Sequence, residues 1–266
     1  MLCLRRVGLA VLGFVLLVST QPPRSAAAPS RATVAMVEPA GEALANWSRW
    51  RGPSGQGLAV GAGYPDSWSD TENVAWRASV PGRGHSSPII WGDRIYLTTG
   101  YDDERVAVLA FRRSDGEMLW ETVGPDSTPE KLYPKNSHAS ATPSTDGRRV
   151  YAFFGNKGLL AVDAEDGRLL WHRSLGAFAN YHGTAGSPLL YGDRLILFQD
   201  HKGGSQGGAF IGAFDTATGE PLWRTERQAS VGWGTPIAVR VGERDEIVVN
   251  GQRHVVAYDP DTGREL

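Results

Sequence analysis

Cysteine is nearly absent from this sequence of 266 residues, which contains only Cys3. Because Cys3 lies in a leader that we expect to be cleaved, the mature chain would have no disulfide, cysteine-based zinc site or thiol nucleophile. A positive charge excess is also missing. The formal charge is −2, and without residues 1–28 the chain has 24 basic and 29 acidic residues. A protein that binds nucleic acid through phosphate contacts is therefore disfavoured.

Long apolar runs are also missing, apart from one near the N-terminus. Arg5 and Arg6 precede an uncharged stretch at 7–18, and small residues follow at 25–28. A positive start, a short apolar stretch and small residues at the cleavage site are typical of a secretory signal peptide. The stretch is shorter than the roughly 20 residues that a membrane span needs. We predict a signal peptide at 1–28, with an uncleaved anchor as the alternative, and no membrane span after cleavage.

The rest of the chain divides into three parts. Residues 29–46, rich in Ala and Pro, are predicted to be a linker. Residues 47–84 are predicted to be a lead-in segment with an N-terminal strand, and 85–266 form a repeat region. The chain is 41% hydrophobic and 21% charged, so it can bury a core and wholesale disorder is disfavoured.

Four segments of the repeat region share one pattern. Each opens with Ser or Thr followed by Pro, continues through a polar turn, and ends in Gly-x-x-Leu-Trp, which the fourth segment leaves incomplete at Leu266. The shared turn glycines are Gly116, Gly167, Gly219 and Gly263. The tryptophans that follow them are Trp120, Trp171 and Trp223. Three signals in the same order in four segments indicate an internal repeat.

Short runs of strand-forming residues alternate with turns inside each unit. In the second unit the runs cover 142–145, 150–154, 159–162 and 169–173, bounded by Gly and Asp. Four antiparallel strands at a period of about 40–50 residues are typical of a β-propeller blade. We therefore predict an all-β protein, a β-propeller of four-stranded antiparallel blades. About four blades are present, and we expect them to be a fragment of a larger ring of about 7–8 blades.

The repeated tryptophans are interpreted as packing residues. A large aromatic side chain at one fixed position in each unit suits contacts between neighbouring blades. Trp76, in the lead-in segment, is interpreted as an outer-strand tryptophan without its own blade upstream. Asp163, Asp215 and Asp259 recur at a fixed distance before the turn glycine, so we expect them to cap the turn backbone.

The repeat resembles the pyrroloquinoline quinone (PQQ)-like β-propeller repeat over roughly residues 85–266. The lead-in Trp47-Ser48-Arg49-Trp50-Arg51-Gly52-Pro53 also resembles the opening of exported BamB-like propeller proteins, where such a strand commonly completes the last blade. The resemblance implies a non-catalytic scaffold for protein binding or assembly, with exported or envelope proteins as partners. It implies a location in the periplasm, at the periplasmic face of the outer membrane, or outside the cell.

Two other functions stay open. The same resemblance allows a quinoprotein dehydrogenase, an oxidoreductase that uses PQQ and calcium, with site residues partly beyond Leu266. No catalytic residue can be placed, and Trp233 is the candidate for stacking on the quinone, with blade packing as its alternative. The other hypothesis is a sugar- or polymer-binding propeller that uses Trp47, Trp50 and Trp68.

Three histidines precede the first strands of the first three units. His85, His138 and His182 lie three, five and six residues before the proline of their unit. The first strand of a blade is innermost, so the loops that enter it gather at one mouth of the channel. Imidazole is a common zinc or copper ligand, which makes these residues candidate metal ligands. Their unequal spacing favours hydrogen bonds within each loop instead, so we assign no metal or cofactor.

Overall fold

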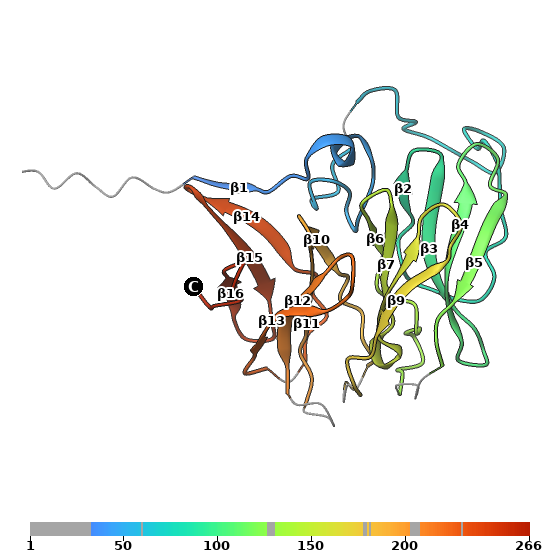
Figure 1. Ribbon diagram of the computed structural model, residues 1–266. Coiled ribbons are helices and arrows are strands. Elements are labelled where there is room, and N and C mark those ends of the chain that lie inside the picture. Colours follow the sequence, from blue (N-terminus) through green and yellow to red (C-terminus); the bar gives the residue numbers. More distant parts are fainter. Residues whose placement is uncertain are drawn as a thin grey trace, which may run out of the picture. The chain divides into compact units, whose positions relative to one another are not determined.

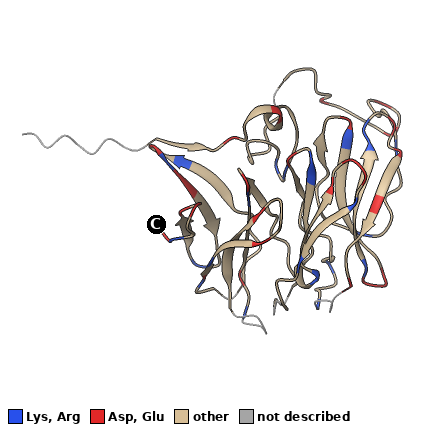
Figure 2. Ribbon diagram, in the orientation of Figure 1, with Lys and Arg blue, Asp and Glu red and all other residues tan. Residues whose placement is uncertain are grey.

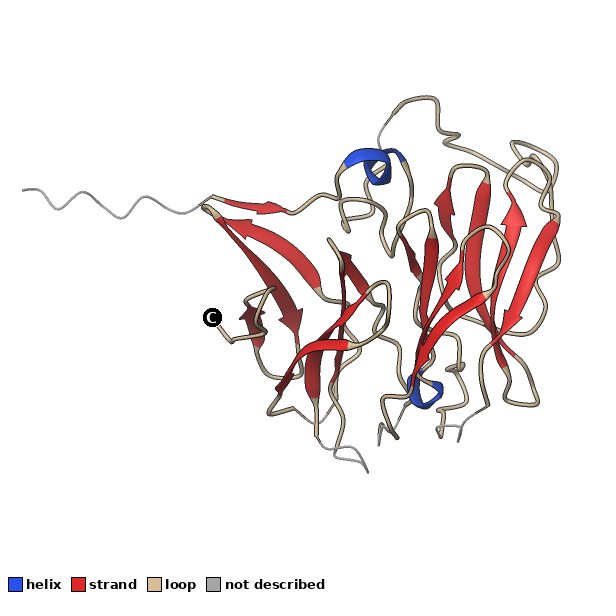
Figure 3. Cartoon of the chain, viewed as in Figure 1, coloured by secondary structure: helices blue, strands red, loops and turns tan. Residues whose placement is uncertain are grey.

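The computed structural model describes residues 33–59, 61–126, 131–177, 180, 182–202, 208–229 and 231–266. The predicted signal peptide lies outside this set. The described strands form four four-stranded antiparallel sheets, accompanied by two short 3-10 helices, η1 (Gly41–Ala45) and η2 (Gly155–Lys157) (Figures 1 and 3). The predicted all-β propeller class is therefore confirmed. Within this part of the chain, no helix is long and apolar enough to cross a membrane.

Each of the first three sheets is one repeat unit whose strands pair in chain order. The first sheet consists of β2 (Ile89–Trp91), β3 (Arg94–Gly100), β4 (Val106–Arg112) and β5 (Met118–Val123). The second consists of β6 (Ser144–Thr145), β7 (Arg149–Phe153), β8 (Leu159–Asp163) and β9 (Leu169–Arg173). The third consists of β10 (Leu189–Tyr191), β11 (Arg194–Gln199), β12 (Phe210–Asp215) and β13 (Pro221–Glu226).

The fourth sheet takes one strand from far away in the sequence. It contains β14 (Ile237–Val241), β15 (Arg244–Asn250) and β16 (Val255–Tyr258), and β1 (Val34–Met36) pairs antiparallel with β14 (Figure 1). The lead-in strand was expected in residues 47–84, but the described residues there contain only the isolated bridge from Arg83 to Gly100. The strand lies instead in the segment predicted to be a linker, because Val34–Met36 is a short apolar run that can pair with the free edge of β14.

The core lies between neighbouring sheets. One cluster of buried side chains joins the first and second sheets, another joins the second and third, and a third joins the third and fourth. The third strands of the first three sheets, β4, β8 and β12, are buried almost throughout. In β4 every residue from Val106 to Phe111 is at most 4% exposed. The outer strands β5, β9 and β13 contain only exposed and partly buried residues, as strands with one solvent face do. Residues of both charge signs are interspersed over the described chain (Figure 2).

Candidate binding cavity

Each repeat tryptophan lies against the turn glycine of the following sheet. A Cβ atom on Gly167 would lie 2.7 Å from the Trp120 ring, and one on Gly219 would lie 2.6 Å from the Trp171 ring. Trp223 lies against Gly263, and Trp76 lies in the same way against Gly116. All four indole N–H groups donate to carbonyls of the same turns, at 2.8–3.1 Å: those of Arg113, Glu165, Thr216 and Pro260.

The Ser/Thr-Pro signature makes a second contact between units. The Ser87 amide donates to Thr142 Oγ1, the Thr142 amide to Ser187 Oγ, and the Ser187 amide to Thr235 Oγ1, at 2.9–3.2 Å. The three aspartates before the turn glycines accept hydrogen bonds from turn amides: Asp163, Asp215 and Asp259. These repeated residues therefore hold the sheets and their turns together.

The N-terminal segment lies along the free edges of the first strands β2, β6 and β14, which we call the inner edges. The Ile90 amide of β2 donates to the Trp47 carbonyl at 2.8 Å, and the Thr145 amide of β6 donates to the Ser48 carbonyl at 2.9 Å. The fourth sheet receives β1 in the same manner. Residues 33–49 thus bind three of the four sheets through backbone groups.

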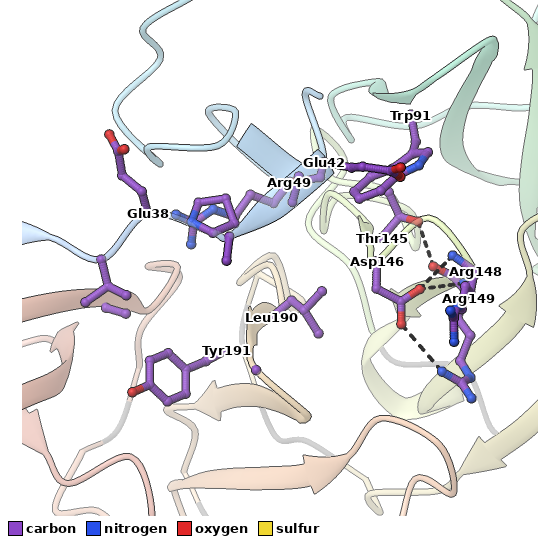
Figure 4. Close-up of a pocket in the computed structure, with 17 residues that line it drawn as sticks. Glu38, Glu42, Arg49, Trp91, Thr145, Asp146, Arg148, Arg149, Leu190 and Tyr191 are labelled. Carbon is purple, nitrogen blue, oxygen red and sulfur yellow. Dashed lines mark hydrogen bonds and ion pairs between the residues drawn. The ribbon is translucent and has the colours of Figure 1, made fainter. Parts of the chain in front are cut away.

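A cavity of about 770 Å³ opens between this segment and the turns that follow the first strands (Figure 4). The N-terminal segment contributes Glu38, Glu42 and the buried Arg49. The first sheet contributes Trp91. The remaining labelled residues come from the β6–β7 and β10–β11 hairpins: Thr145, Asp146, Arg148, Arg149, Leu190 and Tyr191.

Arg49 is fixed in the wall of the cavity. Its guanidinium donates to the Gly52 carbonyl at 3.3 Å and to the Pro53 carbonyl at 2.6 Å, and burial lowers its pKa. These bonds turn Arg49 toward its own loop. Arg49 therefore holds the segment in place while its donors are used inside the protein.

The β6–β7 turn carries two arginines in different states. Arg149 lies 3.5 Å from Asp146, which also accepts a hydrogen bond from the buried Tyr151 hydroxyl at 2.8 Å. Burial, followed by the Asp146 charge, raises the pKa of Tyr151. The neighbouring Arg148 is exposed, and no carboxylate lies within ion-pair distance of its guanidinium among the described residues. Arg148 is thus available to an anionic group in the cavity.

Tyr191 fixes the opposite wall to the fourth sheet. Its hydroxyl donates to Asp245 Oδ2 at 2.8 Å, and burial together with this bond raises its pKa to about 12. Arg240 also pairs with Asp245 and, with Tyr191, lowers the pKa of that carboxyl group. The cavity therefore combines fixed walls, both charge signs and strand backbone. This combination suits hydrogen bonding and ion pairing with a bound chain.

The candidate histidines lie in loops at the other ends of the sheets. The His85 amide donates to the Ala139 carbonyl. His138 Nδ1 is buried and has no hydrogen-bond partner among the described residues, and burial is the main cause of its lowered pKa. His182 lies between Tyr133 and Trp233, with ring centroids 5.0 and 5.4 Å away. Over the described ranges no three His, Cys, Asp or Glu side chains gather as metal ligands, so the histidines are not brought together as such a group.

Trp233, the candidate for stacking on a quinone, is held in place by a hydrogen bond from its indole ring. Its indole N–H donates to the Gly183 carbonyl at 2.9 Å, and its side chain remains 40% exposed. It borders a shallow pocket of about 290 Å³ with Tyr133 and His182. Stacking of the Trp233 ring on a quinone stays a prediction. Of the lead-in tryptophans, Trp47 lies against Gly52, Trp50 lies under the Arg51 guanidinium and Trp68 is exposed.

The sequence pattern does not predict the residues that line the cavity. Arg148, Leu190 and Tyr191 lie in or beside the polar turns, which were interpreted only as repeat markers. The repeat prolines could have served to locate part of the cavity. The residue two positions after each of them lies on the first strand of its sheet. Glu38 and Glu42 had no comparable signal, since they lie in the segment predicted to be a linker.

A family profile described as "Outer membrane protein assembly factor BamB" matches residues 30–265. The chain belongs to this family. A curated relative, the outer membrane protein assembly factor BamB of Burkholderia pseudomallei, is 26% identical over 200 residues, covering 72% of this chain and 46% of the relative. The chain thus spans about half the length of that relative.

One solved structure supports the fold. The crystal structure of BamB from Moraxella catarrhalis is 17% identical, with a TM-score of 0.52, and the alignment covers 74% of this chain and 54% of that one. A quinohemoprotein alcohol dehydrogenase from Pseudomonas putida aligns with a TM-score of 0.48 and 15% identity, over 73% of this chain and 35% of that one. The second likeness carries no functional argument.

Proposed function

We propose that this BamB-family protein is an exported, non-catalytic β-propeller that acts as a protein-binding scaffold in outer membrane protein assembly. The observation that carries the proposal is the family match over residues 30–265. The name of the Burkholderia pseudomallei relative provides the assembly role, and the predicted signal peptide provides export to the periplasm or the periplasmic face of the outer membrane.

The cavity supports binding rather than chemistry. Its walls are fixed by backbone hydrogen bonds and by the Tyr191–Asp245 contact, so a partner would meet a preformed surface. Preformed sites bind with a smaller ordering cost than flexible ones. Packed sheets beneath exposed turns form the kind of rigid support on which binding loops are commonly carried.

The proposal is tested in the source cell with the full natural protein carrying an affinity tag. After cross-linking in the intact envelope, we expect outer membrane assembly proteins to be enriched by at least about tenfold over a tagged, unrelated exported protein. Fractionation of the same cells should place the protein in the periplasm or the outer membrane fraction. A folded, exported protein that enriches no assembly protein would contradict the proposed function.

The quinoprotein dehydrogenase is the alternative, and a second experiment separates it. Purified protein is titrated with PQQ in the presence of calcium, and dye-linked oxidation of alcohols is followed. The scaffold proposal predicts neither saturable quinone absorbance nor oxidation. Saturable binding together with alcohol-dependent dye reduction would replace the scaffold by an oxidoreductase. A Trp233→Leu variant, compared with Trp68→Leu, would then test whether Trp233 stacks on the quinone.

A further inference from the structure

The position two residues after the repeat proline lies on the inner edge in all four sheets. In sequence order these residues are Ile90, Thr145, Leu190 and Ala238. Because they share one register in their repeats, their backbone groups can be compared directly.

Three of the four positions bind the N-terminal segment. Ile90 and Thr145 donate their amides to the carbonyls of Trp47 and Ser48. The Ala238 carbonyl accepts from the Val37 amide at 3.0 Å, directly after the β1–β14 pairing. The N-terminal segment is therefore held on three inner edges by backbone hydrogen bonds, as strand β1 on β14 and through one hydrogen bond each to β2 and β6. These bonds do not depend on the identity of the side chains.

Leu190 is the exception. Its hairpin has the same register as that of Ile90: Tyr191 pairs with Arg194 as Trp91 pairs with Arg94, and Leu190 pairs with Leu195 as Ile90 pairs with Ile95. The two-residue turn makes Tyr191 and Arg194 the hydrogen-bonded pair, so the Leu190 amide and carbonyl point away from β11. No described residue bonds them on that side, and Leu190 lines the cavity.

The charges around Leu190 indicate what an occupant would carry. In Figure 4 Leu190 lies between Tyr191 and the Asp146–Arg149 pair. Arg149 is already paired with Asp146, whereas no carboxylate of the described residues pairs with the adjacent Arg148. Glu38 and Glu42 line the side formed by the N-terminal segment. A carboxylate is therefore favoured near Arg148 and disfavoured near the two glutamates.

We propose that the cavity binds an extended peptide segment of a partner protein, which pairs with the inner edge of β10 through Leu190 and places a carboxylate at Arg148. Strand addition gives affinity through the backbone, and a charge-assisted hydrogen bond to a guanidinium adds selectivity. The inference deepens the proposed function and rests on it, since it names the kind of partner segment that the scaffold would hold.

The test uses a fluorescein-labelled peptide of about seven residues, alternating Thr and Val and ending in a pair of Glu, with binding to the full chain followed by fluorescence anisotropy. A second peptide has the same sequence with alternate backbone nitrogens methylated, which blocks strand pairing on one edge. A third ends in a pair of Lys. We expect the first peptide to bind at least about tenfold more tightly than either of the others.

Variants then locate the site. Arg148→Gln should weaken binding of the Glu peptide about five- to tenfold, whereas Arg168→Gln, an exposed arginine of an outer turn, should change it less than twofold. Leu190→Pro removes the amide that faces the cavity and should weaken binding by at least about tenfold. If that variant does not fold, the methylated peptide still tests the backbone pairing.

Three results would overturn the inference: equal binding of the methylated and unmethylated peptides, equal loss in Arg148→Gln and Arg168→Gln, or no binding of the Glu peptide at about 1 mM. If the peptide fails to bind while assembly proteins are still enriched in the cell, the cavity assignment falls and the scaffold stands. If the peptide binds at Leu190 but no assembly protein is enriched, the proposed function falls and the peptide site stands.

Discussion

The contacts at the outer turns are the same in every sheet, whereas the contacts at the inner edges differ from sheet to sheet. At the outer turns one contact is repeated four times, an indole against a glycine, and every copy is complete. At the inner edges the N-terminal segment binds the first, second and fourth sheets, and the third faces a cavity. The repeat thus builds the framework, and a segment outside the repeat makes the sheets unequal.

Trp76 shows how the two regions meet. It belongs to the lead-in segment, yet it contacts Gly116 as the repeat tryptophans contact their glycines. The segment that precedes the repeat therefore supplies both a standard outer contact and the individual inner contacts. A contact that repeats in every sheet is expected to stabilise the fold. The inner edge of the third sheet, which the N-terminal segment does not cover, is available for binding.

The largest expected effect lies at the outer turns. Gly167→Ala places a Cβ against Trp120 and Thr122 at a backbone φ of 76°, and we expect it to lower the free energy of unfolding by about 2–4 kcal/mol. Gly192→Ala is the matched control, since its φ is 58° and nothing lies within 4 Å of the added Cβ. It should cost only about 1 kcal/mol in denaturant unfolding. Equal losses would show that the indole contact is not what restricts Gly167.

A smaller effect separates the occupied and open inner edges. Ile90→Pro removes the amide that donates to Trp47, whereas Leu190→Pro removes an amide without a partner in the described structure. Both substitutions impose the same φ restriction at the same register. We expect Ile90→Pro to lower the free energy of unfolding by about 1–2 kcal/mol more than Leu190→Pro. Equal unfolding midpoints in urea would contradict the difference between these edges.

The smallest effect concerns the contact that holds β10 in place. Since the pKa of Asp245 is lowered in the folded protein, its stabilising contribution is present above the unfolded pKa of about 3.9. That contribution is lost as pH falls through the folded pKa. Asp245→Asn should therefore remove less than about 1 kcal/mol at neutral pH and make stability less sensitive to acid. Asp66→Asn, at an exposed lead-in residue, is the control and should leave the free energy of unfolding at neutral pH unchanged.

Most of the strands and turns of the sheets could be predicted from the sequence, because the same pattern recurs in each repeat unit. In the second unit the strands predicted at 150–154, 159–162 and 169–173 match β7, β8 and β9 within one residue. The repeat region contains four turn glycines, four Ser/Thr-Pro pairs and three repeat tryptophans. Because each feature recurs at the same place in its unit, its common role could be predicted without a structure.

The cavity could not be predicted in the same way, because it depends on a segment that has no second copy. Nothing in Val34–Met36 or in Trp47 and Ser48 indicates which inner edge they bind, since their hydrogen bonds use backbone groups. Leu190 is likewise an ordinary apolar strand residue. Its importance arises only from the comparison with Ile90, Thr145 and Ala238 after their partners are known.

Amide hydrogen exchange of the folded protein, followed by NMR, tests the central claim most directly. Hydrogen-bonded amides exchange slowly, and a free amide that faces a cavity exchanges faster. We predict that the amides of Ile90 and Thr145 are protected at least about a hundredfold more than that of Leu190, and that the Glu peptide restores protection at Leu190. Equal protection of the three amides in the free protein would contradict the open inner edge on β10.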